Sequence, residues 1–223
     1  MIFSIILKKR GKLEIFKLSF IIFIAFWASC QKYQESDKVK TLIKQKKYDQ
    51  ALQEAQKESN LIKKLNYLGI IYSKKGNFKK SESCYNKVLE KDSKNFKALY
   101  NLGILKTKSR NFKEALNIFS KLENLYPEKT DIKIKKAWVH YYLLSNSNAI
   151  GILKKIVNKN RKTLTLNQWK EISKLYENLK RYRASAEAYD YYLSKVKQQN
   201  IKTDIKKAQI HLEKLKSQRN QEL

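Results

Sequence analysis

The chain of 223 residues carries 49 Lys and Arg against 20 Asp and Glu, which gives a formal net charge of +29. It contains one Pro and five Gly, too few turn-forming residues for a sandwich, a barrel or a parallel α/β sheet. Hydrophobic residues make up 42%, too many for a disordered polycation, so the composition predicts an all-helical globular protein.

The first predicted element is an export signal. Residues 1–17 are basic, and residues 18–28 form an apolar run that only Ser19 interrupts. This run is shorter than the roughly 20 residues that a membrane-spanning helix needs, but it fits the apolar centre of a signal peptide.

The end of this run, Trp27-Ala28-Ser29-Cys30, resembles the lipobox of bacterial lipoproteins. The resemblance implies that residues 1–29 are removed and that Cys30 carries a diacylglycerol, with a further acyl chain such as palmitate on the new amino terminus. The mature protein is then exported and held by lipid at a membrane of the cell envelope, with residues 30–35 as a short tether. The alternative is a plain secretory signal or an uncleaved anchor, in which Cys30 has no such role.

Residues 36–61 are predicted to form a shortened helix pair. Tyr48, Ala51 and Ala55 have the spacing of the aromatic and small residues in the second helix of the repeats that follow.

The region 62–199 contains an internal repeat of 34 residues. Leu68-Gly69 and Asn77-Phe78-Lys79 recur as Leu102-Gly103 and Asn111-Phe112-Lys113. This period and these residues resemble the tetratricopeptide repeat, a pair of antiparallel helices. The units, with a two-residue slip before the last, are 62–95, 96–129, 130–163 and 166–199.

Small residues mark the places where the paired helices are expected to touch, because a larger side chain would push close-packed helices apart. Position 8 of the four units holds Gly69, Gly103, Ala137 and Ser173, and position 20 holds Ser81, Ala115, Ala149 and Ser185. Gly76 is predicted to end a helix in the left-handed conformation, and Thr165 and Gln168 to form a capping box. In the third unit, Lys133 and Lys136 stand where apolar residues are usual, which predicts a rotated or shifted first helix.

The last element, residues 200–223, is predicted to be a capping helix and tail. One amphipathic face contains Ile201, Ile205, Ala208, Leu212 and Leu215, and a solenoid needs such a helix to cover its last repeat. The predicted fold class is therefore an all-α tetratricopeptide α-solenoid, a right-handed superhelix of antiparallel helix pairs with a C-terminal cap.

No catalytic motif, phosphate-binding loop or metal-ligand cluster occurs in the sequence. His140, His211 and Cys84 are interpreted as packing residues. We therefore expect no enzymatic activity, no cofactor and no metal.

By its resemblance to the family, the chain is expected to bind a partner in a groove lined by the first helix of each unit. The predicted groove residues are Asn66, Ile70, Tyr100, Asn101, Ile104, Ile134, Trp138 and Tyr141, and the predicted rim residues are Lys63, Lys74, Lys97 and Lys108. An apolar centre and a cationic rim suit a protein or peptide with acidic flanks. The alternative is that these side chains only pack against neighbouring repeats.

Some relatives clamp a terminal carboxylate with Lys and Asn residues of adjacent repeats. Asn101 matches one element of that clamp, but Asp131 and Lys135 stand where two basic residues are expected. The sequence therefore does not predict a complete clamp.

The predicted function is that of a membrane-anchored scaffold in a bacterial cell envelope. Its architecture is similar to that of lipoproteins that assist outer-membrane protein assembly. The alternative is binding of a polyanion, either anionic lipid or nucleic acid, through the high charge. However, 43 of the cations are Lys and six are Arg, which favours a solvated surface, and export argues against nucleic acid.

Overall fold

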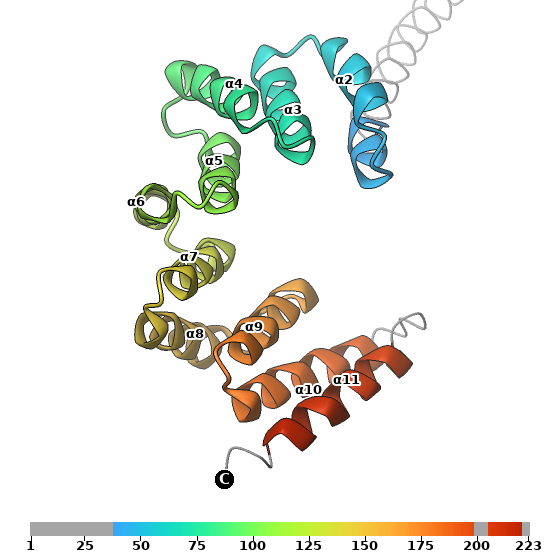
Figure 1. The fold of residues 1–223 in the computed structure, drawn as a ribbon, viewed down its shortest axis with the longest axis vertical. Coiled ribbons are helices and arrows are strands. Elements are labelled where there is room, and N and C mark those ends of the chain that lie inside the picture. The colour runs from blue at the N-terminus through green and yellow to red at the C-terminus, as the bar shows by residue number, and fades with distance from the viewer. Residues whose placement is uncertain (1–37, 199–204, 220–223) are drawn as a thin grey trace, which may run out of the picture. The chain divides into compact units, whose positions relative to one another are not determined.

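A computed structural model describes residues 38–198 and 205–219, and all regular structure within these residues is helical (Figure 1). The predicted signal peptide, Cys30 and the predicted tether lie outside the described residues. The chain divides after Val88 into two compact units. Among the described helices, none has the length and apolar character that crossing a membrane requires.

The first unit begins with a helical segment at 38–44, followed by α2 (Tyr48–Gln56), α3 (Leu61–Lys74) and most of α4 (Phe78–Lys91). The side chain of Asn60 caps α3 by accepting a hydrogen bond of 2.9 Å from the backbone N–H of Lys63. Gly76 follows α3 with a φ of 80°, so the predicted left-handed turn is confirmed. Ala51 and Ala55 of α2 share a core with Ile71 of α3.

In its described residues, the second unit contains three helix pairs and a last helix. The first helices of the pairs, α5, α7 and α9, also contact one another in order, since α7 packs against both α5 and α9. The bounds are α5 (Phe96–Lys108), α6 (Phe112–Leu125), α7 (Thr130–Tyr142), α8 (Asn146–Asn160), α9 (Leu166–Asn178), α10 (Tyr182–Gln198) and α11 (Ile205–Arg219).

Small residues lie at the helix contacts, as predicted. All eight residues at positions 8 and 20 are buried. A Cβ atom built on Gly103 of α5 would lie 2.8 Å from Cζ of Phe119 on α6, and one on Gly69 would collide with the ring of Tyr85. In the last pair, the hydroxyls of Ser173 and Ser185 are hydrogen-bonded at 3.1 Å.

The first helix of the third repeat keeps Ala137 at the helix contact but turns other apolar residues inward than its neighbours do. Ala137 at position 8 is fully buried, as are Ile132 and Ile134. These two isoleucines supply the apolar contact that Lys133 and Lys136 do not. Lys136 is half-buried and forms an ion pair of 2.9 Å with Glu123 of α6.

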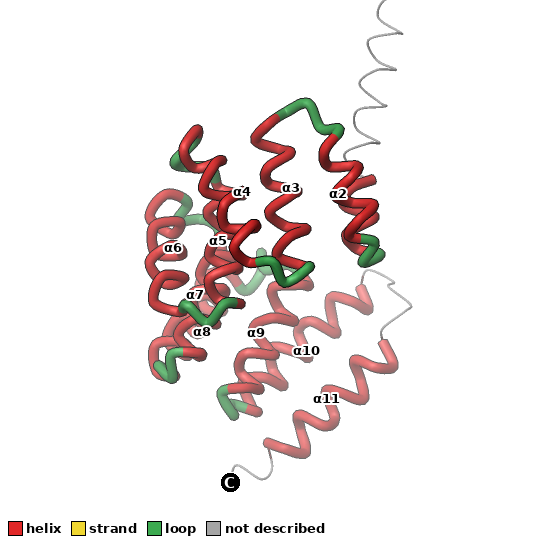
Figure 2. Tube along the Cα trace, turned by 45° about the horizontal axis from the view of Figure 1, so that its top comes forward, coloured by secondary structure: helices red, strands yellow, loops and turns green. Residues whose placement is uncertain are grey.

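The last helix covers α10, as the sequence predicted. Figure 2 shows α11 alongside α10, and the two helices are in contact. Ala208, Leu212 and Leu215 are buried in the same core cluster as Tyr189 and Leu193 of α10. Ile201 lies outside the described residues.

Candidate functional site

The layer formed by α5, α7 and α9 borders an open pocket of about 730 Å³ within the second unit. Ile104 of α5 and Trp138 of α7 line it, together with the turn between α5 and α6 and the beginning of α6. We refer to its ring-bearing lining residues as the aromatic side and to its ionic lining residues as the charged side.

The aromatic side is a row of three rings. Phe112 stacks on Tyr142 with the ring centroids 5.3 Å apart, and Tyr142 stacks on Trp138 at 6.0 Å. Such stacked arrangements fix the ring orientations. Tyr142 is nevertheless 43% exposed, so this row offers an ordered apolar surface to a ligand.

The charged side contains four cations and one carboxylate. Lys108, Arg110, Lys135 and Lys174 line the pocket, and Glu171 is the acidic residue among them. The Nζ atom of Lys135 lies 2.7 and 2.8 Å from the two carboxylate oxygens of Glu171. The net charge of these side chains is positive, which favours a ligand that carries negative charge.

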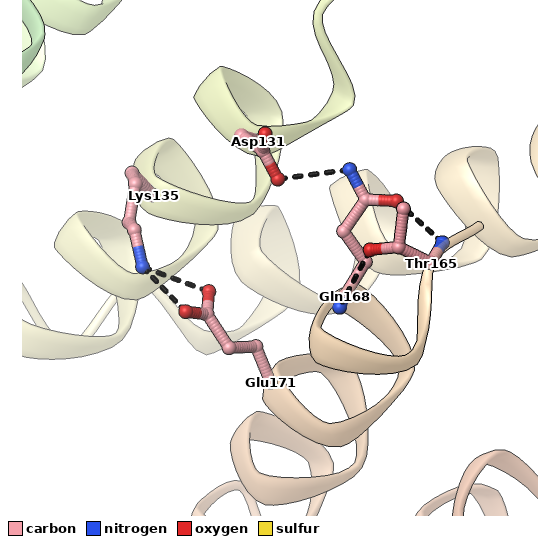
Figure 3. Close-up of polar contacts among 5 residues, drawn as sticks. All are labelled: Asp131, Lys135, Thr165, Gln168 and Glu171. Carbon is pink, nitrogen blue, oxygen red and sulfur yellow. Dashed lines mark hydrogen bonds and ion pairs between the residues drawn. The ribbon is translucent and has the colours of Figure 1, made fainter. Parts of the chain in front are cut away.

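A second polar contact joins α7 to the beginning of α9 (Figure 3). The Nε2 atom of Gln168 donates a hydrogen bond of 2.8 Å to Oδ1 of Asp131. Gln168 also closes a capping box with Thr165, so the predicted cap of α9 is confirmed. The same hydrogen bonds hold the side chain of Gln168 in place to bind Asp131.

Tyr100 of α5 lies near these carboxylates. Burial raises the pKa of its hydroxyl above the ordinary value, and the negative charges of Asp131 and Glu171 raise it further. The phenol therefore remains protonated at neutral pH.

Three of the residues predicted from the sequence line the pocket: Ile104, Trp138 and Lys108. Tyr100, Asn101 and Tyr141 are half-buried and are not among its lining residues. The ring of Tyr141 contacts Trp138 edge to face, with centroids 5.9 Å apart. Lys97 is exposed but does not line the pocket.

Two of the predicted groove residues are buried, as the alternative of packing against neighbouring repeats expects. Ile134 is fully buried in the core that α7 shares with α9. Asn66 is 6% exposed, and its Nδ2 atom donates to the carbonyl of Ile62 at 2.9 Å. Ile134 packs against residues of α9, whereas the side chain of Asn66 bonds to its own helix, α3.

The remaining predicted residues lie in the compact unit that ends at Val88. Ile70 is half-buried and Lys74 is exposed. Lys63 forms an ion pair of 2.6 Å with Glu58.

Sequence reasoning missed Phe112, Tyr142 and Glu171 as members of one pocket, whereas Lys174 stands at position 9, the groove position of Ile104 and Trp138. Tyr142 occupies position 13 of its unit, the position from which Lys74 and Lys108 were predicted as rim residues. Continuing that position into the third unit would have found it.

Neither Asp131 nor Lys135, the residues at the clamp positions, is left to hold a terminal carboxylate alone. Asp131 accepts from Gln168, and Lys135 is paired with Glu171. In the structure, both side chains therefore contact side chains of α9.

The histidines and the cysteine outside the pocket have ordinary packing environments. Burial lowers the pKa of half-buried His140 below its usual value, and the charge of Lys136 adds to this effect. His211 lies edge to face with Tyr189 at 4.7 Å. Cys84 is buried, and burial raises the pKa of its thiol. Within the described residues, no group of three or more His, Cys, Asp and Glu side chains could hold a metal ion.

Comparisons with known proteins show what this architecture is similar to. Residues 62–95 match the family model described as tetratricopeptide repeat. These bounds are the ones that the sequence predicted for the first repeat. A search of curated proteins finds no match to this chain.

Solved structures show the same fold. A thermophilic tetratricopeptide repeat protein of Thermus thermophilus is 14% identical with a TM-score of 0.63, and the match covers 82% of this chain and 97% of that one. PilF of Pseudomonas aeruginosa is 16% identical with a TM-score of 0.57, covering 81% and 90%. A tetratricopeptide repeat protein of Parabacteroides merdae is 17% identical with a TM-score of 0.54, covering 84% and 74%. The predicted α-solenoid of helix pairs is thereby confirmed.

Proposed function

We propose that this tetratricopeptide repeat protein, whose fold is that of a protein-interaction scaffold, docks a peptide segment of another protein in the pocket bordered by α5, α7 and α9. The row of stacked rings formed by Phe112, Tyr142 and Trp138 carries the proposal. Aromatic side chains that remain partly exposed beside a cavity are typical of sites where a partner supplies the missing contact.

The chemistry of the pocket favours a segment with an apolar side chain between acidic residues. The rings offer an apolar surface, and Lys108, Arg110 and Lys174 supply positive charge around it. Charge of the opposite sign on a partner speeds association and disfavours basic partners.

Peptide binding to the full-length protein in detergent tests this proposal. The probes are peptides acetylated and amidated at their ends, with a central Phe between two Glu residues on each side, and a matched peptide with Ala in place of Phe. We expect the Phe peptide to bind more tightly than the Ala peptide. The double variant Trp138→Ala with Tyr142→Ala is expected to lower the affinity for the Phe peptide at least tenfold, as for interface hot spots. Fluorescence anisotropy measures the affinity.

Leu144→Ala is the control, because Leu144 is 86% exposed and is not among the lining residues of the pocket. We expect it to leave the affinity unchanged. Equal binding by the double variant, with its circular dichroism preserved, would remove the pocket from the proposed function.

The proposed scaffold is anchored to a membrane through Cys30. The signal-like sequence and the Ala28-Ser29-Cys30 ending support this part of the proposal. The mass of the amino-terminal peptide from the native protein tests it: fatty acids on Cys30 are expected, whereas an intact Met1 would contradict it. A scaffold held in this way would serve the assembly of other envelope proteins, which cross-linking in cells can test.

Polyanion binding is the competing function, and it rests on the net charge of +29. The two differ in their dependence on salt. Binding to anionic lipid or nucleic acid falls steeply as salt rises because it releases counterions. We expect docking on the aromatic row to retain most of its affinity between low and moderate ionic strength. A steep loss, unaffected by Trp138→Ala, would favour the polyanion.

A further inference from the structure

The cationic side of the pocket already holds a carboxylate that belongs to the chain itself. Glu171 reaches from α9 to Lys135 on α7 with both of its oxygens within hydrogen-bond distance of Nζ (Figure 3). We infer that Glu171 is a built-in competitor, which an acidic side chain of the docked peptide must displace from Lys135. The inference rests on the proposed function and specifies how the pocket selects its ligand.

The pair is placed where a ligand can reach it. Lys135 and Glu171 both line the pocket, and their side chains are 24% and 42% exposed, respectively. Ion pairs that remain partly in water contribute little net free energy. Replacing one carboxylate on Lys135 by another is therefore close to balanced, and a peptide that also fills the aromatic side can drive the exchange.

The contact between α7 and α9 does not depend on this pair. Gln168 binds Asp131 at 2.8 Å between the same two helices, and Ile134 and Ile172 are buried in one shared core. Releasing Glu171 from Lys135 therefore leaves the two helices joined.

The surrounding charges give the exchange its selectivity. Lys108, Arg110 and Lys174 line the same pocket as Lys135, and like charges gathered in one cavity attract an anion. A peptide with neutral flanks cannot replace Glu171 and gains nothing from Lys135. Glu171 thus lowers the affinity for acidic peptides, whereas it leaves that for neutral ones unchanged.

The test compares the Glu-flanked Phe peptide with a Gln-flanked Phe peptide on the full-length protein. Glu171→Gln is expected to raise the affinity for the Glu-flanked peptide by roughly twofold to fivefold, the range of a partly exposed ion pair, and to leave the affinity for the Gln-flanked peptide unchanged. Lys135→Gln is expected to lower the affinity for the Glu-flanked peptide. In the double variant, the gain from Glu171→Gln disappears, because its cause is the release of Lys135.

Glu123→Gln is the matched control. Glu123 pairs with Lys136 at 2.9 Å, the two side chains are 30% and 23% exposed, and neither lines the pocket. The substitution makes the same change in net charge and also frees a lysine on α7. We expect it to leave both peptide affinities unchanged.

Three outcomes would overturn the inference. Unchanged or weaker binding of the Glu-flanked peptide by Glu171→Gln would show that the pair only joins two helices. An equal gain in Glu123→Gln would assign the effect to net charge. If neither peptide binds the unsubstituted protein, the proposed function itself fails and the inference falls with it.

Discussion

In the described part of the chain, each turn between the two helices of a pair contains one residue in the left-handed conformation, and only one of these residues is a glycine. Within the described residues, the φ angles are 61° at Lys46, 80° at Gly76, 61° at Arg110, 59° at Leu144 and 55° at Lys180. The spacing from Gly76 onward follows the repeat, including its two-residue slip. The turn is therefore set by the fold, and non-glycine residues adopt it at a cost of about 1–2 kcal/mol each.

Leu144→Gly is expected to stabilise the protein by about 0.5–1 kcal/mol. Glycine removes the strain of the left-handed conformation, which exceeds the extra entropy it loses on folding, and the leucine side chain is 86% exposed, so little burial is lost. Urea unfolding measures the change. Lys180→Gly should change stability in the same direction, and Gly76→Ala should lower it. A loss of stability in Leu144→Gly would show that this turn can relax at no cost.

At the scale of the elements, the distance between paired helices depends on the absence of a side chain. Gly103 of α5 lies against the ring of Phe119 on α6, which is 1% exposed. Phe119 also packs edge to face with Tyr100 at 6.1 Å. The ring therefore cannot move aside without disturbing the layer that borders the pocket.

Gly103→Ala is expected to destabilise the protein by about 1–3 kcal/mol, the usual cost of an added methyl group in a packed core. Gly151→Ala is the matched control, since Gly151 lies inside α8 and a Cβ atom added there would meet nothing within 4 Å. It is expected to stabilise by about 0.5–1 kcal/mol through helix propensity. Thermal unfolding of both variants measures this difference. Equal effects would mean that α5 and α6 have room to separate.

At the scale of the whole molecule, stacked repeats leave an apolar face at the end of the array, and α11 covers it. Leu215 is fully buried, whereas Ile210 on the same helix is 64% exposed. The last helix thus completes the core of the second unit through one face.

Leu215→Ala is expected to cost about 2–5 kcal/mol, because it removes transfer free energy and leaves a cavity. Ile210→Ala removes an aliphatic side chain of the same size from the same helix and should change stability by less than about 0.5 kcal/mol. Chemical denaturation distinguishes the two variants. A small effect of both would contradict the role of α11 as a cap.

The candidate site was predicted only in part from the sequence. Trp138 and Ile104 were found because they recur at groove positions of the repeat. Ile134 also occupies a predicted groove position but is buried. It supplies the apolar contact that is missing in α7 because Lys133 and Lys136 stand where apolar residues are usual. A repeat pattern gives the average role of a position, and a local substitution changes that role.

The sequence by itself determined the helix pairs, their register and their covered end, because small residues and amphipathic faces act between neighbours along the chain. Only the tertiary structure decided which side chains share the pocket. Phe112, Tyr142 and Glu171 come from three different helices, and of the three only Tyr142 stands at a repeat position from which the sequence had predicted a groove or rim residue. Their meeting depends on how far each helix pair is rotated against the next, which the packing of whole side chains sets.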